Sequence, residues 1–217
     1  MLKQFYEKDK IEIGIDEAGR GCLFGPVFVA GVVWLDKDPN ETKEYILKDS
    51  KKCSEKKRIL LRNYIQENAL AYSVVSISER EIDKTNILKA TMKGMHQCVD
   101  EIREKLDIDM ILVDGNHFDI YTDKEMNPID HECVINGDNT YKSIAAASIL
   151  AKTYRDEYIL SLVRDYPQLS MYAIQNNKGY GTKAHMNAIK DNGITQFHRR
   201  TFKPCCNYIK NSSLIKT

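Results

Sequence analysis

The stretch Gly14-Ile15-Asp16-Glu17-Ala18-Gly19-Arg20-Gly21 places two adjacent acids after an apolar segment and then flanks an arginine with two glycines. The end of a strand holds side chains rigidly, and glycines let another backbone, such as a nucleic acid, approach closely. Adjacent carboxylates repel each other, so they are stable as anions mainly when a cation lies between them. The pattern indicates metal-assisted phosphodiester chemistry, although an Asp-Glu pair alone is more typical of a polar turn after a strand.

The charge of the chain is divided unevenly along its length. The 217 residues are enough for one substantial core, and their net charge is only +1. Residues 151–217 carry 11 Lys or Arg against 4 Asp or Glu, whereas the first 150 residues have a net charge of −6. An acidic body suits a metal site and a basic end suits a polyanion, although a solvated basic face without a partner gives the same counts.

The cysteines and the apolar segments argue against a zinc protein, a secreted protein and a membrane protein. Six cysteines form no C-x-x-C pair and no zinc-like spacing with histidine. The first ten residues lack an apolar segment, and no stretch approaches the length that spans a membrane. We therefore expect a reduced, cytoplasmic protein with thiols that serve in packing and with no membrane partner.

Hydrophobic periodicity predicts an alternation of strands and helices. Strands are expected over 11–15, 26–35, 71–77, 109–113 and 132–135, with a turn at 36–40. Helices are expected over 55–68, over 82–106 with a helix start at 78–81, over 143–162 and over 183–190, and a loop is expected over 176–182. This alternation predicts an α/β fold with a mixed sheet flanked by helices. We divide the chain into a core, residues 1–165, and a small basic helical and loop extension, residues 166–217, packed on that core.

Three of the predicted strands end in acids, which are Asp16 with Glu17, Asp114 and Asp138. Binding sites in α/β sheets gather at strand ends, so these acids are expected to converge. Carboxylate oxygens select Mg²⁺ or Mn²⁺ rather than zinc. Two such ions about 4 Å apart can hold the attacking water and the leaving 3′-oxygen of a phosphodiester. Each acid has an alternative role, because Asp114 can end a strand in a turn and Asp138 can cap the next helix.

The motifs together resemble bacterial ribonuclease HII, a type 2 ribonuclease H. The opening G-I-D-E-A-G-R-G with G-P-V-F-V-A-G-V-V carries the resemblance. It continues in order through Asp49–Lys52, Ile82–Leu88, Val113–Gly115, Ser143–Lys152 and Lys178–Thr182. Mild departures occur over 193–202, and residues 119–130 match no pattern and are interpreted as a variable loop.

The resemblance implies a ribonuclease H-like fold whose acids Asp16, Glu17, Asp114 and Asp138 bind Mn²⁺ or Mg²⁺ and are catalytic. The expected activity is endonucleolytic cleavage of the RNA strand of RNA–DNA hybrids and nicking 5′ to ribonucleotides embedded in duplex DNA. Two-metal hydrolysis leaves a 5′-phosphate and a 3′-hydroxyl. This activity fits ribonucleotide excision repair, and we expect a monomer.

Substrate contacts follow from the same resemblance and from charge. Gly19, Arg20 and Gly21 match the segment that senses the 2′-hydroxyl, and Tyr180 matches a tyrosine at the RNA–DNA junction. The positions expected to contact the nucleic-acid backbone are Lys51, Lys52, Ser148 and Lys152. Asp156 is interpreted as a support of its helix rather than a catalytic acid.

Two other functions are compatible with clustered acids. One is another ribonuclease H-like nuclease, such as a 3′–5′ exonuclease or a junction resolvase, which lacks the G-R-G after D-E. The other is a nucleic-acid-binding module that has lost catalysis, against which the presence of all four acids argues.

Overall fold

The computed structural model describes residues 2–34, 45, 47, 50 and 53–211. The predicted turn at 36–40 and the two predicted contacts Lys51 and Lys52 lie outside these residues. The chain forms two compact units, and neither is continuous in sequence. The first unit comprises Met1–Ala18, Phe28–Val75 and Met92–Thr153, and the second comprises Gly19–Val27, Ser76–Thr91 and Tyr154–Thr217. The predicted division at residue 165 stays a prediction.

A five-stranded mixed sheet forms the centre of the first unit. Its order is β3-β2-β1-β4-β5, with β1 antiparallel to β2 and parallel to β4, and with β4 parallel to β5. The strands are β1 (Glu12–Ala18), β2 (Val27–Val33), β3 (Ala71–Ile77), β4 (Met110–Asp114) and β5 (Asp130–Val134). The predicted mixed sheet is confirmed.

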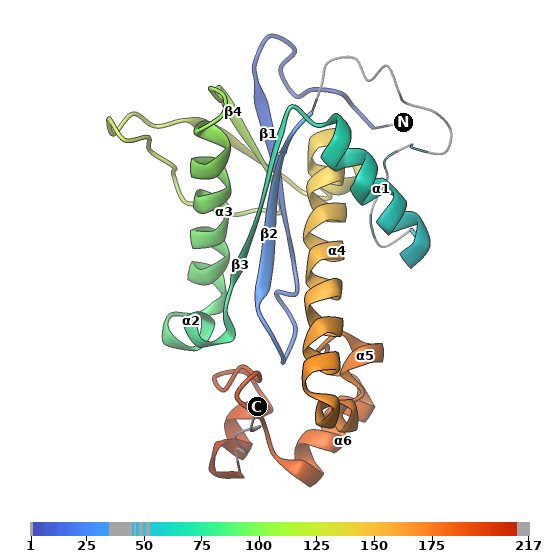
Figure 1. The fold of residues 1–217 in the computed structure, drawn as a ribbon. Helices are drawn as coiled ribbons and strands as arrows, with labels where there is room; N and C mark the ends of the chain where they lie inside the picture. The colour runs from blue at the N-terminus through green and yellow to red at the C-terminus, as the bar shows by residue number, and fades with distance from the viewer. Residues whose placement is uncertain (1, 35–44, 46, 48–49, 51–52, 212–217) are drawn as a thin grey trace. The chain divides into compact units, whose positions relative to one another are not determined.

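Helices α3 (Ile87–Arg103) and α4 (Lys142–Asp165) cover opposite faces of this sheet. A side chain at Gly14 would collide with the backbone of α4 at Ser143 and Ile144. A side chain at Gly31, which lies opposite Ile15, would instead meet residues of α3. Because neighbouring residues of a strand point to opposite faces, the two helices lie on different sides, as Figure 1 shows.

Local sequence signals fix several element boundaries. Helix α1 (Glu55–Asn68) and β3 have the predicted bounds, and the Ser54 side chain caps α1 by accepting from the Lys57 N–H. The predicted helix 82–106 is wrong in its continuity, because α2 (Glu79–Lys84) ends at Thr85, whose backbone is not helical. Asn86 then accepts from the Lys89 N–H and starts α3. Such side-chain hydrogen bonds compete with a continuous helix.

The second unit has its own apolar core, built from segments far apart in sequence. Its helical elements are α2, the start of α3, the end of α4, η3 (Pro167–Tyr172), α5 (Ile174–Asn177), α6 (Lys183–Asn192) and η4 (Cys205–Asn211). Phe24 packs in this core with Ile159, Tyr172 and Ile189. The Asp83 carboxylate accepts hydrogen bonds from the backbone of Arg200 and Thr201, which joins α2 to the chain's end. The predicted loop 176–182 begins with the last two residues of α5.

Within the described part of the chain, no helix combines the length and the apolar character that crossing a membrane requires.

Substitution of Gly14 by alanine is expected to destabilise the protein by at least about 2 kcal/mol, because the new methyl group meets backbone atoms that cannot rotate away. Urea unfolding measures this loss. Gly21→Ala is the matched control, since a side chain there meets no atom within 4 Å, and it should leave the free energy of unfolding nearly unchanged. Equal stability of G14A and wild type would contradict the close packing of β1 on α4.

Candidate active site

The register of two parallel strands brings Asp16 and Asp114 together. Ile15 of β1 lies opposite Val113 of β4, so the next residue on each strand is an acid at the same end of the sheet. Gly14 faces α4, and alternation places the Asp16 side chain on that same face. The predicted end of the first strand at residue 15 is corrected, because Asp16–Ala18 continue to pair with β2. Asp16 and Glu17 therefore lie within a strand whose end is held by β2.

Asp16 is a buried carboxylate in a field of negative charge, with only 6% of its surface exposed. Burial raises the pKa of Asp16 well above its ordinary value, and the charges of Glu17 and Asp114 raise it further. Hydrogen bonds from Ser148 and from the Glu17 N–H act in the opposite direction. Two of the other predicted acids thus act on the carboxyl of Asp16.

Asp138 lies on the connection that follows β5. The predicted strand 132–135 is β5 (Asp130–Val134), and Asp138 belongs to the short 3-10 helix η2 (Gly137–Asn139). The Gly137 N–H donates to Oδ1 of Asp114 at 2.6 Å, which ties this turn to the end of β4. Asp138 is 2% exposed, and α4 begins only at Lys142, so Asp138 is not the cap of that helix.

The four acids have the donor chemistry of a divalent-cation site, and they offer only oxygen atoms. The negative charges of Glu17 and Asp114 beside Asp16 are of the sign that a bound cation would neutralise. In the part of the chain that the structure describes, however, no three His, Cys, Asp or Glu side chains are already grouped to hold a metal ion. The acids are neighbours here without forming a closed set of ligands.

Ser148 supports the acids from α4. Its hydroxyl lies 2.9 Å from that of Ser50, and it also hydrogen bonds to Asp16. Ser148 is buried, and Lys152 follows one turn later on the same helix, half-buried. The predicted contacts of Ser148 and Lys152 with nucleic acid stay predictions.

The second unit contains the Gly19–Gly21 segment and the Tyr180 loop. Gly19 has φ +91°, and a side chain there would overlap the guanidinium of Arg155. Arg20 is exposed, whereas its backbone carbonyl accepts a hydrogen bond from Arg199. Tyr180 is 42% exposed, and its ring centre lies 5.8 Å from the guanidinium carbon of Arg155.

Two fully buried arginines that the sequence analysis missed hold these segments. Arg155 donates to the carbonyls of Phe24, Pro26 and Lys178, and thereby joins the chain before β2 to the Tyr180 loop. Arg199 donates to the carbonyls of Arg20 and Gly25. The sequence signal for these arginines is their place in the motifs Tyr154-Arg155-Asp156 and His198-Arg199-Arg200. Asp156 itself is buried, and its supporting role stays a prediction.

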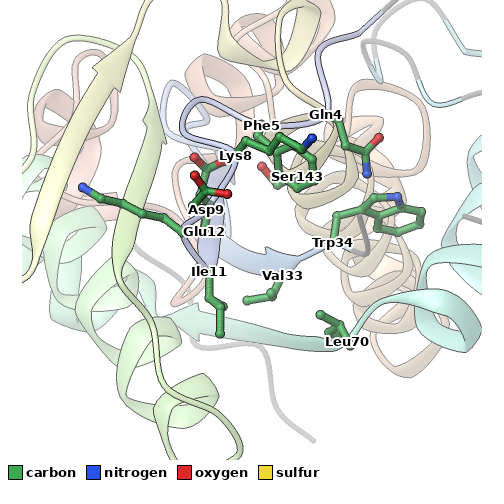
Figure 2. A pocket seen from close by; sticks show the side chains of 11 residues that line it. Gln4, Phe5, Lys8, Asp9, Ile11, Glu12, Val33, Trp34, Leu70 and Ser143 are labelled. Atoms are coloured by element: carbon green, nitrogen blue, oxygen red, sulfur yellow. The ribbon is translucent and has the colours of Figure 1, made fainter. Parts of the chain in front are cut away.

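A pocket of about 240 Å³ in the first unit is separate from the acids. Figure 2 shows Glu12, Val33 and Trp34 among the side chains that line it, at the start of β1. Asp16 lies four residues further along the same strand, roughly 13 Å away. This pocket therefore takes no part in the candidate site.

Comparisons with known proteins identify a matching family and its members. The family model described as Ribonuclease HII matches residues 13–205. A Ribonuclease HII from Parabacteroides distasonis is 48% identical over 202 residues, which cover 93% of this chain and 94% of that protein.

Solved structures share the fold. The ribonuclease H2 from Pyrococcus horikoshii OT3 matches with a TM-score of 0.72 and 23% identity over 92% of this chain and 97% of that one. Bst-RNase HIII in complex with Mn²⁺ matches with a TM-score of 0.66 and 19% identity over 92% of this chain and 69% of that one. The predicted ribonuclease H-like α/β fold is thereby confirmed.

Asp16→Asn is expected to stabilise the metal-free protein at neutral pH. A carboxyl whose pKa is raised by folding contributes stability only below its unfolded pKa, and that contribution is lost as the pH rises through the folded pKa. Removing the charge should therefore raise Tm by about 2–4 °C at pH 7 in EDTA, with the gain shrinking toward pH 4. Thermal unfolding followed by circular dichroism measures this difference.

Asp123→Asn provides a control of opposite sign. Hydrogen bonds from Asn127 lower the pKa of Asp123, so its stabilising effect is present above the unfolded pKa and lost as the pH falls. This variant should have a lower Tm than wild type at pH 7. A lower Tm for D16N as well would contradict the buried, charge-crowded environment assigned to Asp16.

Proposed function

The chain belongs to the ribonuclease HII family, and from this premise we propose that Asp16, Glu17, Asp114 and Asp138 are its catalytic centre and hold divalent cations. The predicted family is confirmed, and its activity is cleavage of RNA in RNA–DNA hybrids and at ribonucleotides embedded in duplex DNA. The chain is accordingly an endoribonuclease.

The parallel register of β1 with β4 is the observation that carries this assignment. It places Asp16 beside Asp114 at one end of the sheet, and Glu17 adds a third charge that raises the pKa of Asp16. The Gly137 N–H links Asp114 to the turn that contains Asp138. Such a concentration of negative charge supports a cation site better than it supports a turn or a helix cap.

Mn²⁺ or Mg²⁺ is the cation that the all-oxygen donor set favours. A ribonuclease HIII of the same fold has been solved in complex with Mn²⁺. Bound there, two cations would activate water and stabilise the leaving 3′-oxygen. The residues of the chain hold the carboxylates in place, Ser148 by its hydrogen bond to Asp16 and Gly137 by its bond to Asp114.

Recognition of the ribose is assigned to Gly19, Arg20, Gly21 and Tyr180. The backbone of Gly21 is exposed, whereas Gly19 is buried beside Arg155 and precedes the exposed Arg20. The guanidinium of Arg20 can donate to a 2′-hydroxyl. The half-exposed ring of Tyr180 offers a flat surface to a sugar. Lys51, Lys52 and Lys152 are proposed to contact phosphates. We further propose that the enzyme is monomeric and cytoplasmic and acts in ribonucleotide excision repair.

A closed circular DNA duplex with one ribonucleotide tests the function. In Mn²⁺ or Mg²⁺, wild type should make one nick 5′ to the ribonucleotide, leaving a 3′-hydroxyl, and should make none in EDTA or in an all-DNA circle. An exonuclease cannot begin on a circle, and a binding module cuts nothing. Cutting of both circles would contradict ribose recognition.

Replacing Asp114 by asparagine should lower the nicking rate by at least about a thousandfold, because several kcal/mol of charge stabilisation at the cation site are lost. The matched control is Asp130→Asn, at the other end of the neighbouring strand, whose exposed side chain pairs only loosely with Lys10 at 3.6 Å. D130N should keep the wild-type rate. Retained nicking by folded D114N would refute the site assignment.

Removal of the Tyr180 ring should raise the KM for the single-ribonucleotide duplex about tenfold, through the lost aromatic contact with the sugar. The control is Tyr6→Ala, because Tyr6 is exposed to a similar extent, 43% against 42% for Tyr180. Steady-state nicking rates against substrate concentration distinguish the two variants. A KM shift of equal size in Y6A would contradict the specific role of Tyr180.

A further inference from the structure

Two histidines buried in the second unit form a hydrogen-bonded pair that ends on the backbone of Tyr180. Nε2 of His185 lies 3.1 Å from Nε2 of His198, and both side chains are almost fully buried, at 0% and 1% exposure. At the other end, Nδ1 of His185 lies 3.0 Å from the Tyr180 carbonyl oxygen. Neither histidine entered the sequence analysis as a functional residue.

The partners of the pair determine which nitrogen of each ring holds the proton. The Thr195 N–H donates to Nδ1 of His198 at 3.0 Å, so this nitrogen is an acceptor and the proton of His198 is on Nε2. His198 therefore donates to Nε2 of His185, which leaves the proton of His185 on Nδ1. His185 then donates to the Tyr180 carbonyl. Every bond has one donor and one acceptor only when both rings are neutral.

The surroundings of the pair keep it neutral and fixed. Burial lowers the pKa of His198 to about 3, with a further contribution from His185. Burial also lowers the pKa of His185. The rings of Phe24 and Tyr172 make edge contacts with His198 at centroid distances of 5.1 and 4.9 Å. The pair is consequently a rigid connection between Thr195 and the Tyr180 loop across the physiological pH range.

The Tyr180 loop is anchored at a second point, two residues earlier. Arg155 donates to the Lys178 carbonyl at 2.8 Å and also lies near the Tyr180 ring. The bond from His185 fixes the carbonyl of Tyr180 itself, while its side chain stays exposed. The two anchors fix the backbone at Tyr180, which is proposed to contact the sugar, and at the residue two positions before it.

We infer that His185 and His198 are positioning residues for Tyr180, which pre-organise its ring for the ribose at an RNA–DNA junction. This inference rests on the proposed role of Tyr180. Pre-organisation removes an ordering cost that would otherwise reduce affinity. Loss of the pair should therefore affect substrate binding more than the chemical step.

A matched pair of variants isolates the bond to the Tyr180 carbonyl. His185→Leu removes the donor, whereas His185→Asn keeps an N–H near the position of Nδ1. H185L should raise the KM for the single-ribonucleotide duplex about tenfold with kcat changed less than about twofold, and H185N should recover most of that loss. Circular dichroism and Tm establish that each variant is folded.

A double-mutant cycle with Tyr180→Ala separates positioning from general stability. If the histidine pair acts through Tyr180, H185L should have no further effect on KM in the Y180A background. Equal effects of H185L in both backgrounds would overturn the inference, as would an unchanged KM in H185L alone. His198→Asn, which keeps the acceptor for Thr195 but removes the donor to His185, repeats the test should H185L not fold.

Failure of the proposed function has a different signature. If wild type does not nick the single-ribonucleotide duplex, or if Y180A leaves its KM unchanged, the role of Tyr180 is refuted before the histidines are considered. Normal nicking by wild type, a raised KM in Y180A and an additive cycle refute only the histidine pair.

Discussion

The pairing of β1 with β4 is the constraint on which the candidate centre depends. With Ile15 fixed opposite Val113, Asp16 and Asp114 follow at the same end of the sheet, where Asp16 is buried and its pKa is raised by the charge of Asp114. The repulsion between the acids is offset by apolar burial on the same two strands, where Ile13, Ile15, Leu112 and Val113 are fully buried. Each such side chain contributes roughly 1.5–3 kcal/mol. Burial of these neighbouring side chains therefore opposes the repulsion between the acids at the end of the sheet.

The sequence predicted the fold class because its signals are local. Periodicity located α1 and β3 at their observed bounds, and the alternation of elements indicated a mixed sheet flanked by helices. The break at Thr85 was missed because it depends on side-chain hydrogen bonds that an apolar stripe does not reveal. The continuation of β1 through Asp16 was missed because polar residues extend a strand only when neighbouring strands pair with them.

The acids could be predicted from the sequence, whereas the strand register and the buried arginines and histidines could not. Asp16, Glu17 and Asp114 are visible as acids at the ends of apolar runs, whereas the register that joins them is a property of the sheet. Arginine is a residue type that is mostly found at protein surfaces. Arg155 and Arg199 are buried because their guanidinium groups donate to carbonyls more than 120 residues away in sequence, such as those of Phe24 and Gly25. His185 and His198 meet only when α6 and the chain after it are folded together. Tertiary partners of this kind leave no periodic pattern.

The absence of a side chain at Gly14 has a consequence for how this chain can change over time. The backbone of α4 fills the space that any other residue would need, so this position tolerates no neutral drift. Two residues later the same strand presents Asp16 on the same face. A lineage that keeps the strand packed against the helix therefore also keeps position 16 directed to the same face, whichever residue occupies it. Packing of this kind preserves the backbone geometry of the candidate centre, whereas the carboxylate itself is kept only by selection for its use.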